Sequence, residues 1–240
     1  MAKRGRTFSY ASHKTQRRRV YWIFAGVIIF FLLNSAVSYF FTMRVLRNQS
    51  MEPNLLWGDH FIFSSYQIYS LVPGLSPDAS LPLQRGNVVL LDLYPGDPPG
   101  PVLSLADRLL RFFSAQRLSL VDRDEFHFVK RVIGLPGDEI TMNNFVIRVR
   151  ERGSAFSLTE FELSVQDYTP GIPQNPALWD SYLPFSGYFD PIVLGEDEYF
   201  LLSDDRSNTN DSRTWGPVPS SAIQGRALFR YWPLRRMGRP

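Results

Sequence analysis

One uncharged, apolar segment near the N-terminus constrains the fold more than any other feature of the chain. Residues 20–42 contain no Asp, Glu, Lys or Arg over 23 positions. At about 1.5 Å of rise per residue, a helix of this length extends about 34 Å, which is enough to cross a hydrocarbon core of about 30 Å. The segment therefore predicts a single transmembrane helix. About 200 residues follow it, enough for a folded domain with a real core.

The charges that flank this segment predict its orientation. Seven basic residues and no acidic residue precede it within residues 1–19, whereas only Arg44 and Arg47 follow it closely. Because basic residues accumulate on the cytoplasmic side, residues 1–19 are predicted to form a cytoplasmic tail and residues 43–240 an extracytoplasmic domain. A cleavable secretory signal is the alternative, since residues 36–38 offer a small-x-small cleavage site. The apolar run continues beyond that site, as in a membrane anchor.

The composition excludes several classes of function. The formal net charge of the whole chain is +3, so the basic tail leaves the remaining residues with a net negative charge, and no nucleic-acid partner is expected. The chain has no Cys, so no disulfide can stabilise an exported domain. Its three histidines show no metal-ligand spacing, and we expect neither a metal nor another cofactor.

Hydrophobic patterns after the apolar segment predict a mainly β domain. Strands are expected at residues 88–93, 125–133, 145–150, 198–202 and 227–231. Residues 160–165 alternate between Glu and apolar side chains, which predicts the second strand of a hairpin with one solvent-exposed face. The predicted fold class is therefore an N-terminal single transmembrane helix followed by an exported antiparallel β-sheet domain.

Two segments interrupt the strand pattern and are predicted to be insertions or loops. The first, residues 94–123, opens with a Pro- and Gly-rich cluster and continues with a helical pattern in which Leu105, Leu109 and Phe112 share one face. That amphipathic helix either packs on its own domain or lies on the bilayer surface. The second, residues 168–191, contains five prolines and two glycines and is expected to be irregular.

A serine close to the apolar segment and a lysine on a predicted strand supply a nucleophile and a base. Ser50 lies eight positions beyond Thr42. A serine hydroxyl attacks a peptide carbonyl only when a base removes its proton, and a lysine can act as that base if burial lowers its pKa. Lys130 shares a predicted strand face with Phe128 and Val132, so its surroundings would disfavour the charged amine. Extension of the lysine into solvent from a sheet edge is the alternative.

Three motifs resemble those of type I signal peptidases and occur in the order found in that family. They are Ser50-Met51-x-Pro53, the run Lys130 to Asp138, and Asp211-Ser212-Arg213-x-x-Gly216-x-Val218, and residues 85–89 resemble a further motif. The resemblance covers residues 20 to 232. It implies a membrane-bound serine endopeptidase that cleaves signal peptides from exported precursor proteins after small residues, at Ala-x-Ala sites. It also implies a monomer in the bacterial inner membrane whose partners are precursor proteins and membrane lipid.

The resemblance implies a role for each motif residue. Ser50 would be the nucleophile and Lys130 the general base, which accepts the serine proton and returns it to the leaving amine. Thr209 falls where the family usually places a serine that orients the lysine. Asp211 and Arg213 would form a supporting ion pair near the site.

Two positions depart from the family pattern. Asn48 stands where the family has a small hydroxyl residue that helps bind the oxyanion, and its amide can donate a hydrogen bond in that role. Ser203 stands where the family prefers no side chain. The neighbouring Asp204 is expected to stabilise the residues of the site without contacting the substrate itself. Because of these departures, a catalytically weakened binding or scaffold protein is one alternative. A processing protease dedicated to one envelope substrate is another.

The resemblance also suggests how a substrate would bind. Met51, Pro53, Phe128 and Val129 are expected to line a substrate pocket, although Met51 could equally pack in the core. A precursor strand would bind in extended form along the strand edge before Lys130. Several aromatic residues form either a surface in the lipid interface or part of the core. They are Trp57, Phe61, Phe63, Phe229, Tyr231 and Trp232.

Overall fold

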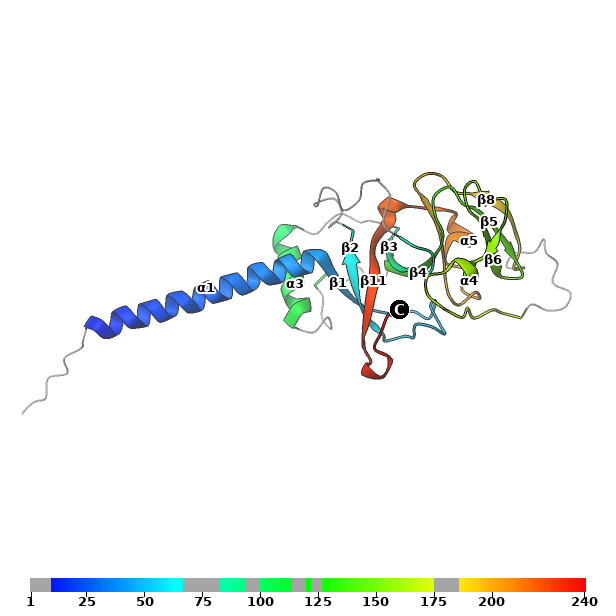
Figure 1. The fold of residues 1–240 in the computed structure, drawn as a ribbon. Coiled ribbons are helices and arrows are strands. Elements are labelled where there is room, and N and C mark those ends of the chain that lie inside the picture. The colour runs from blue at the N-terminus through cyan, green and yellow to red at the C-terminus, as the bar shows by residue number, and fades with distance from the viewer. Residues whose placement is uncertain (1–9, 67–82, 94–99, 114–119, 122–126, 175–185) are drawn as a thin grey trace, which may run out of the picture. The chain divides into compact units, whose positions relative to one another are not determined.

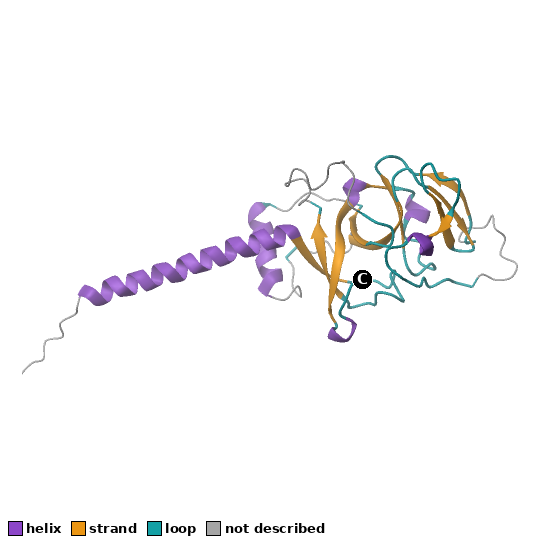
Figure 2. Ribbon diagram, in the orientation of Figure 1, coloured by secondary structure: helices purple, strands orange, loops and turns teal. Residues whose placement is uncertain are grey.

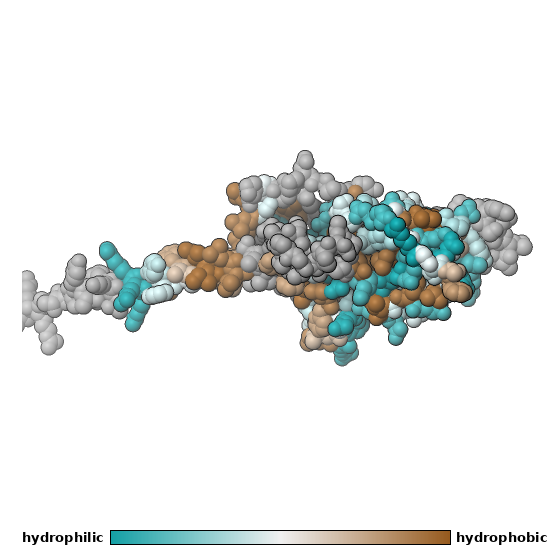
Figure 3. Space-filling model, turned by 45° about the horizontal axis from the view of Figure 1, so that its top comes forward, coloured by the Kyte–Doolittle hydropathy of each residue, from teal (hydrophilic) through white to brown (hydrophobic). Residues whose placement is uncertain are grey.

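The computed structural model describes residues 10–66, 83–93, 100–113, 120–121, 127–174 and 186–240. Its chain divides into two units, Met1–Tyr39 and Phe40–Pro240. A single helix, α1 (Tyr10–Phe40), accounts for the described part of the first unit. Apolar side chains between Val20 and Leu33 are exposed along this helix, after a hydrophilic N-terminal portion (Figure 3). In the described part of the chain, no helix combines the length and the hydropathy that a bilayer crossing requires.

The bounds of α1 differ from those of the predicted span. The helix already includes Tyr10–Arg19, because this part of the tail contains no proline or glycine that would end it. It ends at Phe40, and Phe41 and Thr42 instead begin strand β1, where they lie opposite Ser64 and Phe63 of β2. Strand pairing therefore replaces helix at the end of the uncharged segment.

The second unit contains two antiparallel β-sheets (Figures 1 and 2), which confirms the prediction of a mainly β domain. The larger sheet has the strand order β1-β2-β11-β3-β4-β9-β10 and the smaller one β7-β6-β5-β8. The larger sheet consists of β1 (Phe41–Val45), β2 (His60–Ser65), β3 (Val88–Asp92), β4 (His127–Gly134), β9 (Glu198–Leu202), β10 (Val218–Pro219) and β11 (Ile223–Trp232). The smaller one consists of β5 (Glu139–Asn143), β6 (Val146–Arg150), β7 (Leu158–Thr159) and β8 (Phe189–Val193). The remaining elements are α3 (Pro101–Phe113), α4 (Glu160–Leu163), α5 (Ser212–Trp215), η2 (Ser220–Ala222) and η3 (Leu234–Arg236).

Non-sequential pairing places β4 inside the larger sheet. The last strand, β11, inserts between β2 and β3, although more than 130 residues separate it from β3 in the chain. On one side of β4, Lys130 lies opposite Val89 of β3. On the other side, Arg131 lies opposite Leu202 of β9. The register therefore carries Lys130 into the interior, beside the segment that follows β9.

Hydrophobic clusters cover both faces of β4. Val129 packs in a cluster with Met51, and Val132 packs in a second cluster with Val89. Both faces of this strand are therefore buried. Arg131, which the alternation of the strand places on the face opposite Lys130, is only 1% exposed. A strand with core on both faces has no polar side, so its charged residues must find buried partners.

The predicted strand at residues 160–165 is also wrong. Only Leu158 and Thr159 are extended, and they are followed by the short helix α4. The Thr159 hydroxyl accepts a hydrogen bond from the Glu162 backbone N–H at 3.4 Å, and the Glu162 carboxylate accepts one from the Thr159 backbone N–H at 2.7 Å. This capping box satisfies the free donors of a helix start, and it outweighs the alternating pattern. It turns Glu160 into the interior, where it is 2% exposed.

The two predicted insertions contain regular structure in their described parts. The helix α3 lies where the amphipathic pattern predicts one, while residues 94–99, 114–119 and 122–126 lie outside the described residues. Its Val102 and Leu105 are 82% and 53% exposed, so these side chains do not pack in the core. In the second segment Gly171 forms a β-bridge with Asp205, and residues 175–185 lie outside the described residues. The segment ends in regular structure, because Phe189 begins β8 and pairs with β5.

The aromatic residues considered for a lipid-facing surface divide into two groups. Phe61 and Phe63 of β2 are each 1% exposed and belong to the core. Trp57 and Trp232 are 66% and 50% exposed. Phe229 and Tyr231 are partly buried. Among these six residues, the two phenylalanines of β2 therefore form part of the core, and only the two tryptophans expose a large aromatic surface.

Candidate functional site

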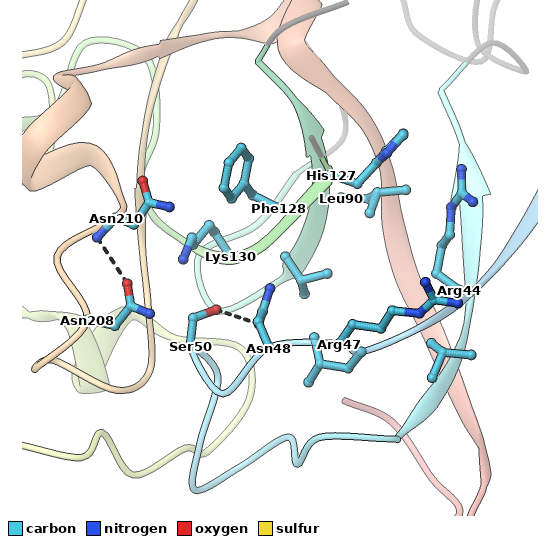
Figure 4. Close-up of a pocket in the computed structure, with 13 residues that line it drawn as sticks. Arg44, Arg47, Asn48, Ser50, Leu90, His127, Phe128, Lys130, Asn208 and Asn210 are labelled. Atoms are coloured by element: carbon cyan, nitrogen blue, oxygen red, sulfur yellow. Dashed lines mark hydrogen bonds between the residues drawn. The ribbon is translucent and has the colours of Figure 1, made fainter. Parts of the chain in front are cut away.

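A cavity of about 460 Å³ brings together four segments that lie far apart in the sequence (Figure 4). It includes five of the predicted site residues, which are Asn48, Ser50, Phe128, Val129 and Lys130. The complete lining consists of Arg44, Val45, Leu46, Arg47, Asn48, Ser50, Leu90, His127, Phe128, Val129, Lys130, Asn208 and Asn210. The end of β1 with the turn that follows it, β3, the beginning of β4 and the loop after β9 thus share one site.

Ser50 is held in a turn that buried neighbours anchor on both sides. Leu46 and Met51 are 3% and 0% exposed and pack in the same hydrophobic cluster. Within the turn, the Glu52 backbone N–H donates to the Gln49 carbonyl oxygen at 3.1 Å. Burial of the residues before and after the turn fixes the backbone at Ser50, whose side chain opens into the cavity.

The Ser50 hydroxyl engages Asn48. Its Oγ donates a hydrogen bond to Asn48 Oδ1 at 2.9 Å (Figure 4). Among the described residues no hydrogen bond joins Ser50 Oγ to Lys130 Nζ. A rotation about the Cα–Cβ bond of Ser50 would break the contact with Asn48 and turn the hydroxyl in another direction, and such contacts are often loose before substrate binds.

Lys130 is buried on β4 and donates to a serine. Its side chain is 1% exposed, and its Nζ donates a hydrogen bond to Ser203 Oγ at 2.8 Å. The same nitrogen lies 5.8 Å from the centre of the Trp215 ring. Among the described residues, Ser203 is therefore the direct hydrogen-bond partner of Lys130, and charged side chains such as Asp211 and Arg213 lie nearby.

Burial lowers the pKa of Lys130 from 10.5 to about 8. The nearby Asp211 carboxylate opposes this shift and the Arg213 guanidinium adds to it. With a pKa of about 8, roughly a tenth of the amine is neutral at pH 7, which is about 300 times the neutral fraction of an unperturbed lysine. A base that is partly neutral near pH 7 can remove a proton from a serine hydroxyl.

A buried ion pair fixes the loop beside the lysine. Arg131 Nε and Nη2 donate to the two carboxylate oxygens of Asp204 at 2.7 and 2.6 Å, and both residues are 1% exposed. Asp204 also accepts a hydrogen bond from Asn54 at 2.9 Å. The next residue, Asp205, donates its backbone N–H to the Ser50 carbonyl oxygen at 3.1 Å. The loop thus contacts the backbone of Ser50 as well as β4.

Asp211 and Arg213 form a second ion pair, at 2.8 Å. Asp211 caps α5 by accepting the Arg213 backbone N–H, and it also accepts the Ser203 backbone N–H at 2.9 Å. Burial alone would raise the pKa of Asp211, but these hydrogen bonds and the Arg213 charge hold it below its ordinary value. Asp211 therefore remains a charged carboxylate in the neighbourhood of Lys130.

Met51, Pro53 and Thr209 do not line the cavity, and for Met51 this is the alternative that the sequence left open. Met51 is 0% exposed in the core, and Pro53 is exposed and does not line the cavity. The Thr209 carbonyl oxygen accepts the Asp211 backbone N–H at 2.8 Å. In the described part of the chain, Lys130 makes no hydrogen bond with Thr209, and Ser203 is its side-chain acceptor.

Sequence reasoning missed the contact of Ser203 and the buried cluster around Arg206. Arg206 pairs with Glu160 through two hydrogen bonds of 2.8 and 2.5 Å, and the Tyr168 hydroxyl donates to the same carboxylate. A signal existed for Arg206, because it lies in the same loop as Ser203 and Asp204, three positions after Ser203. None existed for Glu160, because its ion-pair partner lies 46 residues away in the sequence. Among the described residues, no group of three or more His, Asp or Glu could hold a metal ion.

Comparisons with known proteins agree with the motifs. The family model described as "Signal peptidase, peptidase S26" matches residues 19–232. "Signal peptidase I P" of Bacillus subtilis subsp. natto is 25% identical over 217 residues, covering 90% of each chain. "Signal peptidase I" of Leptolyngbya laminosa is 34% identical over 111 residues, covering 46% of this chain and 44% of that protein. "Probable signal peptidase I-2" of a Synechocystis species is 29% identical over 162 residues, covering 60% of this chain and 63% of that protein.

Several relatives are matched over only part of their length. The chain spans 63%, 44% and 45% of three of the curated relatives it resembles. A crystal structure of a signal peptidase I from Enterococcus faecalis is similar with a TM-score of 0.33 and 18% identity, covering 62% of this chain and 99% of that one.

Proposed function

The chain belongs to the peptidase S26 family of signal peptidases, and on that premise we propose that it is a serine endopeptidase that removes signal peptides from exported precursor proteins. The observation that carries the proposal is the shared cavity of Ser50 and Lys130, in which burial lowers the lysine pKa to about 8. A buried lysine of this kind serves no evident packing purpose, because burying an amine costs stability. Its placement in the same cavity as the Ser50 hydroxyl is instead suited to proton transfer.

The proposed reaction begins with rotation of the Ser50 hydroxyl from Asn48 toward Lys130. The neutral amine takes the hydroxyl proton while Oγ bonds to the scissile carbonyl carbon. The carbonyl oxygen becomes an oxyanion. It can accept hydrogen bonds from the Ser50 backbone N–H and from Asn48 Nδ2, which the hydrogen bond between Ser50 and Asn48 Oδ1 does not use. The Lys130 ammonium then gives its proton to the leaving amine. Water hydrolyses the acyl-enzyme, with Lys130 acting again as base.

The strand pairing supports binding of an extended substrate. Residues 127–130 of β4 pair with β3, whereas pairing with β9 begins only at Arg131. In the described part of the chain, no strand pairs with the second edge of residues 128–130, and these residues line the cavity. A precursor segment could add there as a strand, with Leu90 and Val129 providing an apolar lining for small side chains. Cleavage after Ala-x-Ala sequences is the specificity that the family resemblance implies.

The sequence around α1 supports a membrane-anchored enzyme. The uncharged residues 20–42 and the exposed apolar side chains of α1 suit a lipid environment, and the basic tail favours a cytoplasmic N-terminus. Ser50 follows Thr42 by eight residues, which can span at most about 29 Å. The site would therefore lie close to the outer surface of the bacterial inner membrane, where precursors emerge.

The absence of native cysteine allows a direct test of this topology. Single-cysteine variants Ser12→Cys, in the tail, and Ser207→Cys, in an exposed loop, are treated with a membrane-impermeant maleimide on spheroplasts. Labelling of Ser207→Cys alone is expected, with Ser12→Cys labelled only after lysis. Labelling of Ser12→Cys in intact spheroplasts would contradict the orientation.

The activity is tested by processing of an Ala-x-Ala precursor by the purified full chain in detergent micelles. Wild-type protein is expected to cleave the precursor at that site and to fail on a matched precursor with a bulky residue before the cut. Ser50→Ala and Lys130→Ala are expected to abolish cleavage, whereas Ser207→Ala is the control for an exposed serine. Undiminished cleavage by either site variant would refute the mechanism.

The hydrogen bond from Ser50 to Asn48 favours one second candidate, a binding protein with a weakened site. In that case the serine would stay on Asn48 and would not acylate. Covalent labelling of Ser50 by an acylating inhibitor decides against this candidate.

A further inference from the structure

We propose that Ser203 is the positioning residue that holds the Lys130 amine for proton transfer, the role that the family resemblance gives to Thr209. This inference rests on the proposed function. Ser203 would then contribute to catalysis, although the family prefers no side chain at this position.

The contact between the two side chains is short and fully buried. Lys130 Nζ donates to Ser203 Oγ at 2.8 Å, and the two residues are 1% and 0% exposed. Water cannot readily replace this acceptor at a site of such low exposure. A lysine side chain has four rotatable carbon bonds, so an amine without a fixed acceptor would sample several positions in the cavity. The hydrogen bond to the Ser203 hydroxyl restricts the amine to one of these positions.

The backbone of Ser203 is itself held from two sides. It directly follows β9, and its N–H donates to Asp211 Oδ2 at 2.9 Å. Its carbonyl oxygen accepts from Arg206 Nε at 3.2 Å. Because both partners are buried in ion pairs, the Ser203 hydroxyl projects from a rigid support.

The same loop fixes the position of the lysine relative to the serine. Next to Lys130, Arg131 forms the buried ion pair with Asp204. One residue further along the loop, the Asp205 backbone N–H donates to the Ser50 carbonyl oxygen at 3.1 Å. Three consecutive loop residues thus contact the base, the neighbour of the base and the backbone of the nucleophile. Ser203 is the member of this set that touches the reacting amine.

A hydroxyl oxygen can accept an N–H from the lysine in both of its protonation states. It can therefore hold the neutral amine, leaving the lone pair free for the Ser50 proton, and it can hold the ammonium after transfer. Ser203 is not part of the cavity lining, so it makes no contact with a substrate that fills the cavity. Its loss should therefore lower kcat and leave KM unchanged.

The kinetic test compares Ser203→Ala, Thr209→Ala and the exposed control Ser207→Ala in the full chain. Loss of a correctly placed base costs on the order of 10- to 100-fold in rate. Ser203→Ala is expected to lower kcat by this factor at constant KM, with Ser207→Ala at the wild-type rate and Thr209→Ala close to it. A larger loss for Thr209→Ala than for Ser203→Ala would overturn the proposal, as would an unchanged kcat for Ser203→Ala.

A second readout does not depend on cleavage. The chain has three lysines, and the other two, Lys3 and Lys14, lie in the tail, so selective ¹⁵N labelling of lysine isolates the Lys130 amine. Ser203→Ala is expected to change both the chemical shift and the titration midpoint of this amine, whereas Ser207→Ala leaves them unchanged. An unchanged midpoint and shift in Ser203→Ala would refute the assignment. If the wild type fails to cleave any precursor, the proposed function is wrong, and the titration still decides the role of Ser203.

Discussion

Neutralising Glu160 is expected to cost more stability than any surface substitution in this domain. Glu160 and Arg206 have side chains that are both 0% exposed, and they form an ion pair. The Glu160 carboxylate also accepts hydrogen bonds from the Ile147 backbone N–H at 3.0 Å and from the Tyr168 hydroxyl. Glu160→Gln keeps the shape of the side chain but leaves the Arg206 guanidinium buried without a counter-charge.

The magnitude follows from the cost of an uncompensated buried charge. Removing one partner of a buried ion pair destabilises a protein by about 3–5 kcal/mol. For a domain of about 200 residues, each kcal/mol lowers the melting temperature by about 2–4 °C. Glu160→Gln should therefore lower Tm by about 6–20 °C. Because Arg206 also bonds the Ser203 carbonyl oxygen, the variant should lose activity at temperatures well below unfolding.

Thermal unfolding followed by circular dichroism measures this effect. Glu196→Gln is the matched control, since Glu196 pairs with Arg152 at the surface, where the two side chains are 80% and 71% exposed. Surface pairs of this kind contribute about 0–1 kcal/mol, so the control should melt within about 4 °C of the wild type. Equal melting temperatures for Glu160→Gln and Glu196→Gln would refute the reasoning.

Two further predictions concern stability. Lys130 has a pKa of 10.5 when unfolded and about 8 when folded, so its protonation opposes folding by about 3 kcal/mol below pH 8. Lys130→Met should therefore be more stable than the wild type by up to this amount at pH 7, and the gain should shrink as pH rises from 8 to 10.5. Urea unfolding at several pH values measures it, and a gain that is independent of pH would contradict the burial argument. Gly225→Ala should lower Tm by several degrees, because a Cβ atom there would overlap the Ser64 carbonyl oxygen and disturb the pairing of β11 with β2. A wild-type melting curve would contradict that packing.

Elements with strong local signals could be predicted from the sequence. Residues 88–92 and 198–202 are strands, as their apolar composition indicates, and α3 lies where the amphipathic pattern is strongest. The helix α4 was missed because a capping box between Thr159 and Glu162 overrode an alternating pattern. The burial of Arg131 could not be predicted, because one strand alone does not reveal a second hydrophobic layer.

The features of the candidate site likewise divide into those that short motifs predict and those that depend on pairing between distant strands. Ser50, Lys130 and Asn48 were predicted from short motifs, and the structure brings all three to one cavity. The contact of Lys130 with Ser203 depends on the register between β4 and β9, which pairs residues about 70 positions apart. No local pattern encodes that register, and the family resemblance assigned to Thr209 a contact with Lys130 that Ser203 makes.

The rate at which Ser50 becomes acylated, measured as a function of pH, tests the central claim most directly. Intact mass spectrometry of the full chain with an acylating inhibitor follows the adduct, and peptide mapping locates it. The account predicts an adduct on Ser50 whose rate rises about tenfold from pH 7 to pH 9 around the lysine pKa of about 8. It also predicts no adduct in Lys130→Ala. An adduct at another residue, or acylation of Lys130→Ala at the wild-type rate, would contradict the claim that a neutral lysine activates this serine.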